Sequence, residues 1–155
     1  MGSYPTFSPS TRSDVSMNRN QCDLSTKVAF SAGATSVSST WNKGVLIFPR
    51  VISNAGGGYN PSTGVFTAPT TGHYAFFANV QSYGSSSIFA DIVLNGLSKV
   101  RTVASSNGNE SYEAGPNMVV LALQRGDRVW VRRHSGAGYV SHQDAPVTTF
   151  SGFLI

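Results

Sequence analysis

The chain has 155 residues, a length that suits one domain burying roughly 68–70% of the surface its unfolded chain exposes. Lysine and arginine number 11 against 7 aspartate and glutamate residues, a formal net charge of +4, and only 12% of the residues are charged. This density of cationic side chains is too low for a typical nucleic-acid-binding protein. No apolar run reaches the length of a transmembrane helix, so we expect no membrane insertion.

The first 25 residues contain no apolar periodicity and are rich in Ser, Asn, Arg and Pro. We expect residues 1–25 to form a polar arm or an added segment, partly disordered, ahead of a folded domain at 26–155. The segment has neither the apolar run of a signal peptide nor the Gly-X-Y repeat of a collagen stalk. Cys22, the single cysteine, predicts either an unreactive thiol or a bridge between chains in an oxidising compartment.

From residue 28 onward, short stretches of β-forming residues alternate with turn residues. Residues 28–32 alternate in polarity as a strand does, and the continuous apolar run at 45–48 predicts a strand buried on both faces. Asn95-Gly96 is the strongest two-residue hairpin signal. Further strands are expected at residues 65–66, 74–81, 88–94, 98–104, 117–124, 128–134 and 147–155. With about ten short strands and no helical period, the fold class is an all-β sandwich or jelly roll.

Aromatic residues, glycine and asparagine recur at fixed spacings between residues 48 and 76. The pattern resembles the signature of the C1q globular head domain, and it departs from that signature at Ala78, where an aromatic residue is expected. The residues in register with the signature are Phe48, Asn54, Tyr59, Phe66, Gly72, Tyr74 and Phe76. The segments 123–130 and 149–155 also look like that family.

The resemblance covers residues 26–155 and implies a ten-stranded jelly-roll β-sandwich of the C1q and tumour necrosis factor type. It also implies a secreted domain that assembles as a homotrimer. In such a domain the signature aromatics are structural, so we assign them no ligand.

The densest basic cluster of the chain lies at residues 125–134. On a strand, Arg128 and Arg132 share a face with Trp130, while Arg133 lies on the opposite face. One interpretation is a solvated face with arginine stacked on the tryptophan. The other is a site for an anion or an acidic glycan, because arginine makes bidentate contacts with carboxylate, sulfate or phosphate. Under this interpretation Arg132, Arg133 and His134 bind the ligand.

A long polar loop follows at residues 135–146 and contains Tyr139, His142 and Asp144. Aromatic and polar side chains on a loop at the end of a sandwich suit sugar recognition, although loops of this composition also occur without a ligand. We therefore add these three residues to the predicted ligand-binding site.

The loop at residues 105–115 contains Glu113, which falls near a calcium-binding position of some C1q relatives. Ser105 stands where those relatives have a second acid. Since calcium takes six to eight oxygen ligands, the resemblance leaves Glu113 as a single candidate calcium ligand and no other cofactor. Asn109-Glu110-Ser111 in the same loop is a glycosylation sequon.

No catalytic motif is present, so we do not expect an enzyme. The first hypothesis is a secreted pattern-recognition protein of innate immunity that binds carbohydrate or anionic microbial surface ligands as a lectin does. The alternative is a trimeric extracellular ligand for a cell-surface receptor. Both rest on the family resemblance, because a fold does not determine a function.

Overall fold

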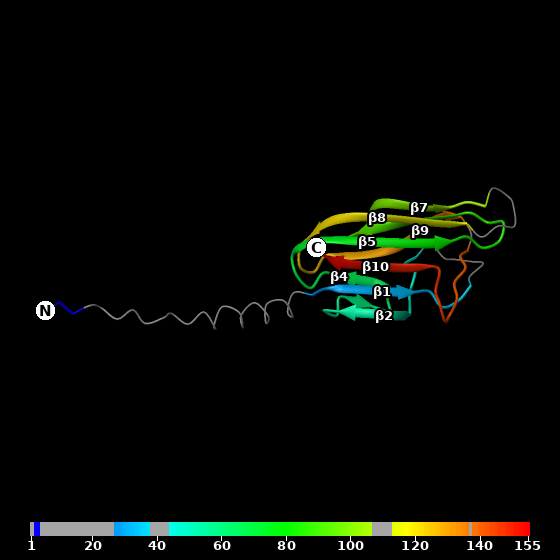
Figure 1. Cartoon of the computed structure of the whole chain (residues 1–155). Coiled ribbons are helices and arrows are strands. Elements are labelled where there is room, and N and C mark those ends of the chain that lie inside the picture. Colours follow the sequence, from blue (N-terminus) through cyan, green and yellow to red (C-terminus); the bar gives the residue numbers. More distant parts are fainter. Residues whose placement is uncertain (1, 4–26, 38–43, 107–112, 137) are drawn as a thin grey trace.

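The computed structural model describes residues 2–3, 27–37, 44–106, 113–136 and 138–155 (Figure 1). These residues contain β-strands and no helix. In chain order the strands are β1 (Ala29–Gly33), β2 (Arg50–Ala55), β3 (Tyr59–Asn60), β4 (Val65–Thr67), β5 (Gly72–Gln81), β6 (Ile88–Leu94), β7 (Leu97–Ala104), β8 (Ala114–Leu123), β9 (Arg128–Gly136) and β10 (Thr149–Leu154).

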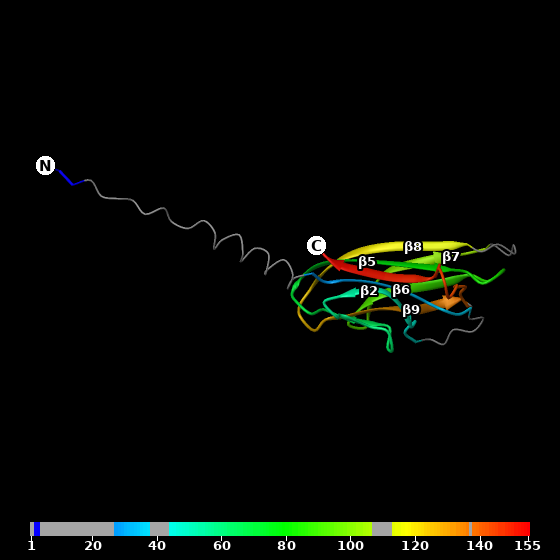
Figure 2. The same ribbon diagram turned by 60° about the horizontal axis from the view of Figure 1, so that its bottom comes forward.

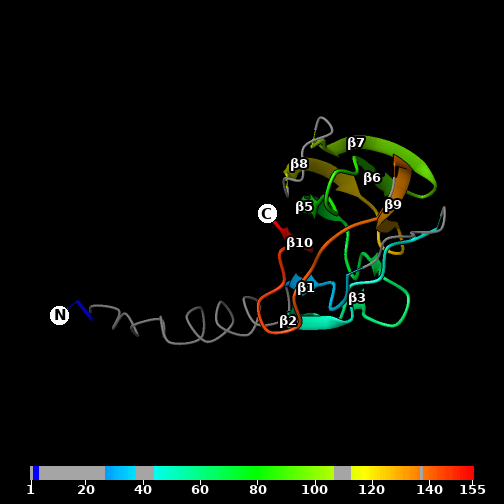
Figure 3. The same ribbon diagram turned by 90° about the vertical axis from the view of Figure 1, so that its right-hand side faces the viewer.

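The ten strands form two antiparallel sheets of five. The first sheet has the order β2-β1-β10-β5-β8 and the second the order β3-β4-β9-β6-β7. The view along the strands shows the two sheets as packed layers (Figure 3), and β10 lies beside β5 inside the first sheet (Figure 2). The prediction of an all-β, ten-stranded jelly roll is confirmed.

The core consists of aromatic rings that the two sheets direct toward each other. Phe30, Phe76 and Phe150 come from the first sheet and meet Phe66 of the second, and all four are at most 2% exposed. The ring centroids of Phe30 and Phe66 are 5.2 Å apart, and those of Phe66 and Phe76 are 5.3 Å apart. Loss of one such ring costs roughly 3–5 kcal/mol, so this cluster contributes a large part of the stability.

The signature residues act structurally, as the resemblance implies. Tyr59 donates a hydrogen bond to the Phe48 carbonyl at 2.7 Å, and burial raises the pKa of the Tyr59 hydroxyl to about 12 although that hydrogen bond lowers it. The Asn54 amide donates to the Tyr59 carbonyl at 2.8 Å. A Cβ at Gly72 would lie 2.6 Å from the end of the Leu154 side chain, so a larger residue there would make Leu154 of the last strand shift.

Two local predictions have different outcomes. The Asn95-Gly96 hairpin is confirmed, with positive φ at both residues. The prediction of a strand buried on both faces at 45–48 is wrong, because only Leu46 and Phe48 are buried and Ile47 is 43% exposed. The segment joins the second sheet through an isolated bridge between Val45 and the β9 strand, so it meets the core on one side only.

Several sequence predictions fall outside the described residues. Cys22, the segment 4–26 and the sequon at 109–111 belong to this group. In the described part of the chain there is no helix with the length and apolar character needed to cross a membrane.

Candidate ligand-binding site on the second sheet

Strand β9 places its basic residues according to the alternation predicted from the sequence. Val129 and Val131 are fully buried and face the core. Arg128, Trp130 and Arg132 alternate with them, are more exposed and therefore lie on the outward face of the second sheet.

A β-bulge in β9 adds His134 to the outward side. Arg133 pairs with Ala90 and Ser135 with Phe89, which leaves His134 as the extra residue. Its Nδ1 atom lies 3.9 Å from a carboxylate oxygen of Asp91. Arg133 lies opposite the buried Ala90, and its Nε atom is buried. Four outward residues of this strand are called the β9 row below: Arg128, Trp130, Arg132 and His134.

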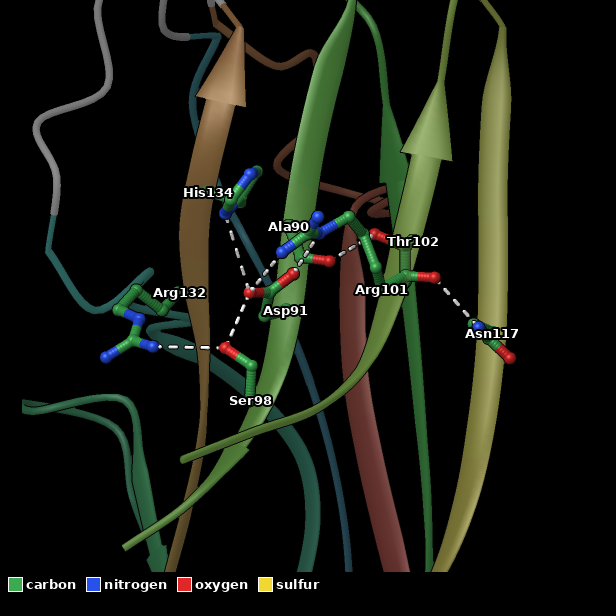
Figure 4. Close-up of polar contacts among 8 residues, drawn as sticks. All are labelled: Ala90, Asp91, Ser98, Arg101, Thr102, Asn117, Arg132 and His134. Atoms are coloured by element: carbon green, nitrogen blue, oxygen red, sulfur yellow. Dashed lines mark hydrogen bonds and ion pairs between the residues drawn. The ribbon is translucent and has the colours of Figure 1, made fainter. Parts of the chain in front are cut away.

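Asp91 of β6 organises the polar contacts on this face (Figure 4). Although it lies on the outward side of the sheet, only 2% of its side chain is exposed. Arg101 of β7 binds it with two hydrogen bonds, Nε to Oδ1 at 2.6 Å and Nη2 to Oδ2 at 3.0 Å. The Ser98 hydroxyl donates to Oδ2 at 2.6 Å. Asp91 is not among the site residues predicted above; the one signal for it is its place as an acidic residue in an otherwise apolar strand.

The Asp91 carboxylate stays ionised because its partners outweigh its burial. Desolvation raises its pKa, whereas hydrogen bonds from Arg101 and Ser98 and the charges of Arg101 and His134 lower it, and the net effect is a lowered pKa. The hydrogen bond to Asp91 also raises the pKa of Arg101. The negative charge of Asp91 is therefore balanced mainly by the guanidinium of Arg101.

Arg132 approaches the same network without pairing with a carboxylate. Its Nη2 donates to the Ser98 hydroxyl at 3.1 Å and its Nη1 to the Gly96 carbonyl at 3.4 Å, both neutral acceptors. In the described part of the chain, the ion pairs found on this face join Asp91 to Arg101 and to His134. Arg132 thus presents a positive charge on the outside of the sheet that is not paired with any acidic residue the structure describes.

The loop at residues 135–146 divides into a packed part and an exposed part. Tyr139 is only 8% exposed, belongs to the hydrophobic core and forms a backbone bridge with Ser82. This corrects the expectation that Tyr139 displays its ring to a ligand, because the ring lies in the interior. His142 and Asp144 are exposed, as expected for loop residues.

The calcium prediction gains no support from the geometry. Glu113 is exposed, and its backbone exchanges hydrogen bonds with Ser82. The Ser105 hydroxyl is paired with that of Ser87 at 2.9 Å. The described residues contain no group of three or more His, Cys, Asp or Glu side chains that could hold a metal, and Glu110 of the same loop lies outside the described residues. Glu113 stays a prediction.

The outward face of the first sheet differs in character. Phe77 and Phe153 stack there with ring centroids 6.2 Å apart and are 40% and 44% exposed. Met118 and Val120 of β8 and the terminal Ile155 extend this apolar surface, with exposures of 46%, 49% and 70%. These five residues are called the apolar patch below.

Comparisons with known proteins agree with this architecture. The sequence profile of the C1q domain matches residues 29–155. Complement C1q tumor necrosis factor-related protein 6 of Mus musculus is 37% identical over 131 residues, which cover 82% of this chain and 49% of that protein. Caprin-2 of Danio rerio is 34% identical over 83% of this chain and 14% of its own length. The chain thus spans about half of the first relative and a smaller part of the second.

Solved structures show the same fold. The globular domain of zebrafish complement 1qA protein superposes with a TM-score of 0.69 at 24% identity, covering 83% of this chain and 98% of that one. Eiger TNF from S. frugiperda superposes with a TM-score of 0.67 at 14% identity, covering 83% and 92%. The match of the C1q profile to most of the chain, together with the relatives above 30% identity, shows that this chain belongs to the C1q domain family.

Proposed function

We propose that this chain is a secreted pattern-recognition protein that assembles as a homotrimer and binds carbohydrate or anionic groups of microbial surfaces. The observation that carries the proposal is the difference in side-chain chemistry between the two outward faces. One sheet displays the apolar patch, which suits assembly, and the other displays an excess of cationic side chains over acidic ones on its described strands, which suits ligand binding.

Assembly through the first sheet follows from the exposed area of its apolar side chains. An aromatic residue contributes roughly 150–250 Å² to a contact, and exposed apolar clusters on folded domains mark interaction surfaces. Phe77 and Phe153 stack within this surface and together present one continuous aromatic contact area. The formal charge of +4 on each chain opposes association, which leaves apolar burial as its driving force.

Ligand binding through the second sheet follows from its charge. The described strands of this sheet contain five Lys or Arg residues and one Asp, and Arg101 already pairs with that Asp. The exposed loop residues His142 and Asp144 and the expected calcium ligand Glu113 are retained as further candidates of the ligand region. Trimeric display would raise the avidity for a repetitive surface by roughly 10²–10⁴.

The experiment measures assembly and binding on the same preparation. Light scattering of the parent and of Cys22→Ser should both report three chain masses, since the proposed interface does not use the cysteine. The trimer is then tested against immobilised acidic polysaccharide, lipopolysaccharide and neutral mannan. A monomer at micromolar concentration overturns the assembly proposal, and a trimer that binds none of the three overturns the recognition proposal.

One observation favours a second function. The relatives include complement C1q tumor necrosis factor-related proteins, and the fold matches Eiger TNF and murine APRIL, the latter with a TM-score of 0.59. We therefore retain a trimeric ligand for a cell-surface receptor as the alternative. A trimer that gives no saccharide signal but binds saturably to protease-sensitive sites on cells would support it.

A further inference from the structure

We propose that the β9 row is a subsite for a linear acidic polysaccharide, in which a sugar ring packs against Trp130 and its acidic groups bind Arg128 and Arg132. This inference rests on the proposed function and narrows its ligand class. It predicts a preference for carboxylated or sulfated chains over neutral ones.

The spacing of the row supports a chain-like ligand. Alternate residues of a strand are roughly 6.6–6.8 Å apart and lie on the same face, so Arg128 and Arg132 flank Trp130 on the outside of the sheet. Trp130 is partly exposed, and its neighbours Val129 and Val131 are fully buried, which directs the indole outward. An indole offers an apolar surface to the C–H groups of a sugar ring and an N–H to its hydroxyls.

Charge favours an acidic ligand over a neutral one. The one acidic side chain on the described strands of this sheet, Asp91, is held by two hydrogen bonds from Arg101. Arg132 makes only bonds to neutral oxygens, of which the Gly96 bond at 3.4 Å is long. A carboxylate or sulfate would replace that long bond with a charge-assisted, bidentate contact, which is shorter and stronger.

Asp91 acts as a positioning residue in this site. Ser98 donates its hydroxyl proton to Asp91 and accepts a hydrogen bond from Arg132 (Figure 4). The buried carboxylate therefore orients Ser98, and Ser98 in turn holds the Arg132 guanidinium on the outward face. His134 lies on the other side of the same carboxylate and extends the row toward the end of β9.

The experiment uses pairs of probes that share a backbone. The full-length protein is tested by biolayer interferometry against immobilised dextran and dextran sulfate, and against polygalacturonate and its fully methyl-esterified form. We expect binding to dextran sulfate and to polygalacturonate, no binding to the two uncharged partners, and weaker binding as salt rises. The two acidic probes distinguish sulfate from carboxylate as the preferred group.

Matched variants then locate the site. Arg132→Ala and Arg128→Ala should each weaken binding roughly 10–100-fold, the range expected for a hydrogen bond to a charged group. Arg125→Ala removes the same charge in the β8–β9 turn, outside the row, and should retain binding within about two-fold. Trp130→Ala should weaken binding, and Trp130→Tyr should restore part of it. Near-ultraviolet dichroism and mass confirm that each variant folds and assembles.

Three results would overturn the inference. Equal losses in Arg125→Ala and Arg132→Ala would show that only the overall charge matters. Wild-type affinity in both Arg128→Ala and Arg132→Ala would place the site elsewhere. Binding to mannan without binding to either acidic probe would remove the acidic ligand class while leaving carbohydrate recognition intact, whereas binding to no saccharide would remove the proposed function as well.

Discussion

The two sheets share one core but face solvent with opposite chemistry. The described strands of the first sheet contain one arginine, Arg50, one histidine, His73, and no acidic residue, and the apolar patch lies on their outward face. The described strands of the second sheet contain five Lys or Arg residues and one acid. Both sheets bury apolar side chains in the same core, so the difference between them lies in the side chains of their outward faces.

Burial on the outward face also differs between the sheets. Phe77 and Phe153 of the first sheet are 40% and 44% exposed despite being large and apolar. Asp91 of the second is charged and only 2% exposed. Exposed aromatic rings and a buried carboxylate both raise the free energy of an isolated domain unless other contacts compensate. For Asp91, the hydrogen bonds from Arg101 and Ser98 provide this compensation within the chain. Within the described residues the aromatic pair stays 40% and 44% exposed, as expected if it lies in the interface proposed above.

The largest expected effect is the loss of stability on removing Phe150 or the last strand, and its size shows whether the two sheets form one cooperative unit. Phe150 of β10 contacts rings from both sheets, with centroids 4.9 Å from Phe30 of β1 in its own sheet and 6.2 Å from Tyr59 of β3 in the second sheet. Phe150→Ala should cost roughly 3–5 kcal/mol, and deletion of residues 150–155 should prevent folding. Circular dichroism and solubility measure both. A soluble deletion variant with native near-ultraviolet dichroism would show that the second sheet folds alone, and the comparison would then concern two independent units.

The next effect addresses the first sheet alone. Phe153→Asp places a charge at the centre of the apolar patch, so we expect the trimer to dissociate at micromolar concentration while the subunit keeps its dichroism spectrum. Leu97→Asp is the matched control, since Leu97 is 67% exposed on β7 of the second sheet. Sedimentation velocity reports the mass of both variants. Dissociation of the control alone would reverse the roles assigned to the two faces.

A smaller effect addresses the second sheet. Asp91→Asn keeps the shape of the side chain but removes the charge that Arg101 and Ser98 hold, and it should lower the free energy of unfolding by about 1.5–3 kcal/mol. Urea denaturation measures the loss. Asp127→Asn is the control, because that carboxylate lies in the β8–β9 turn and bonds to Asn95 at an exposed position. A loss of unfolding free energy no larger than that of Asp127→Asn would mean that the Asp91 charge contributes little to stability.

The smallest effect is the pH dependence of the same group. The folded-state pKa of Asp91 is lowered, so its contribution to stability is fully present above the ordinary Asp pKa of about 4 and declines as the pH falls through the lower folded-state value. Between pH 6 and pH 2.5 the parent should therefore lose more stability than Asp91→Asn. Parallel urea titrations at several pH values measure the difference, and superimposable profiles for the two proteins would contradict the assignment.

Much of the fold followed from the sequence because local residues dictate local geometry. Asn95-Gly96 adopts positive φ at both positions, which few other pairs tolerate, and the hairpin forms where predicted. Alternation along β9 placed Arg132 and Arg133 on opposite faces, because side chains of a strand have a period of two. The resemblance to the C1q signature also indicated the jelly roll.

Other features depend on the register between neighbouring strands or on contacts between distant segments, and only the tertiary structure decided them. Asp91 is buried because Arg101 and Ser98, which lie on the neighbouring strand, cover it. Tyr139 enters the core because its backbone bridges to Ser82, 57 positions earlier by sequence number. His134 joins Arg132 on the outward side because β9 is bulged against β6. Residue type and periodicity therefore indicated most of the strands and the direction of most side chains, although they did not predict β2 and β3. The partners that neutralise the Asp91 charge were decided by the register of β6 with β7, and the burial of the Tyr139 ring by the packing of a distant loop, neither of which residue type and periodicity specify.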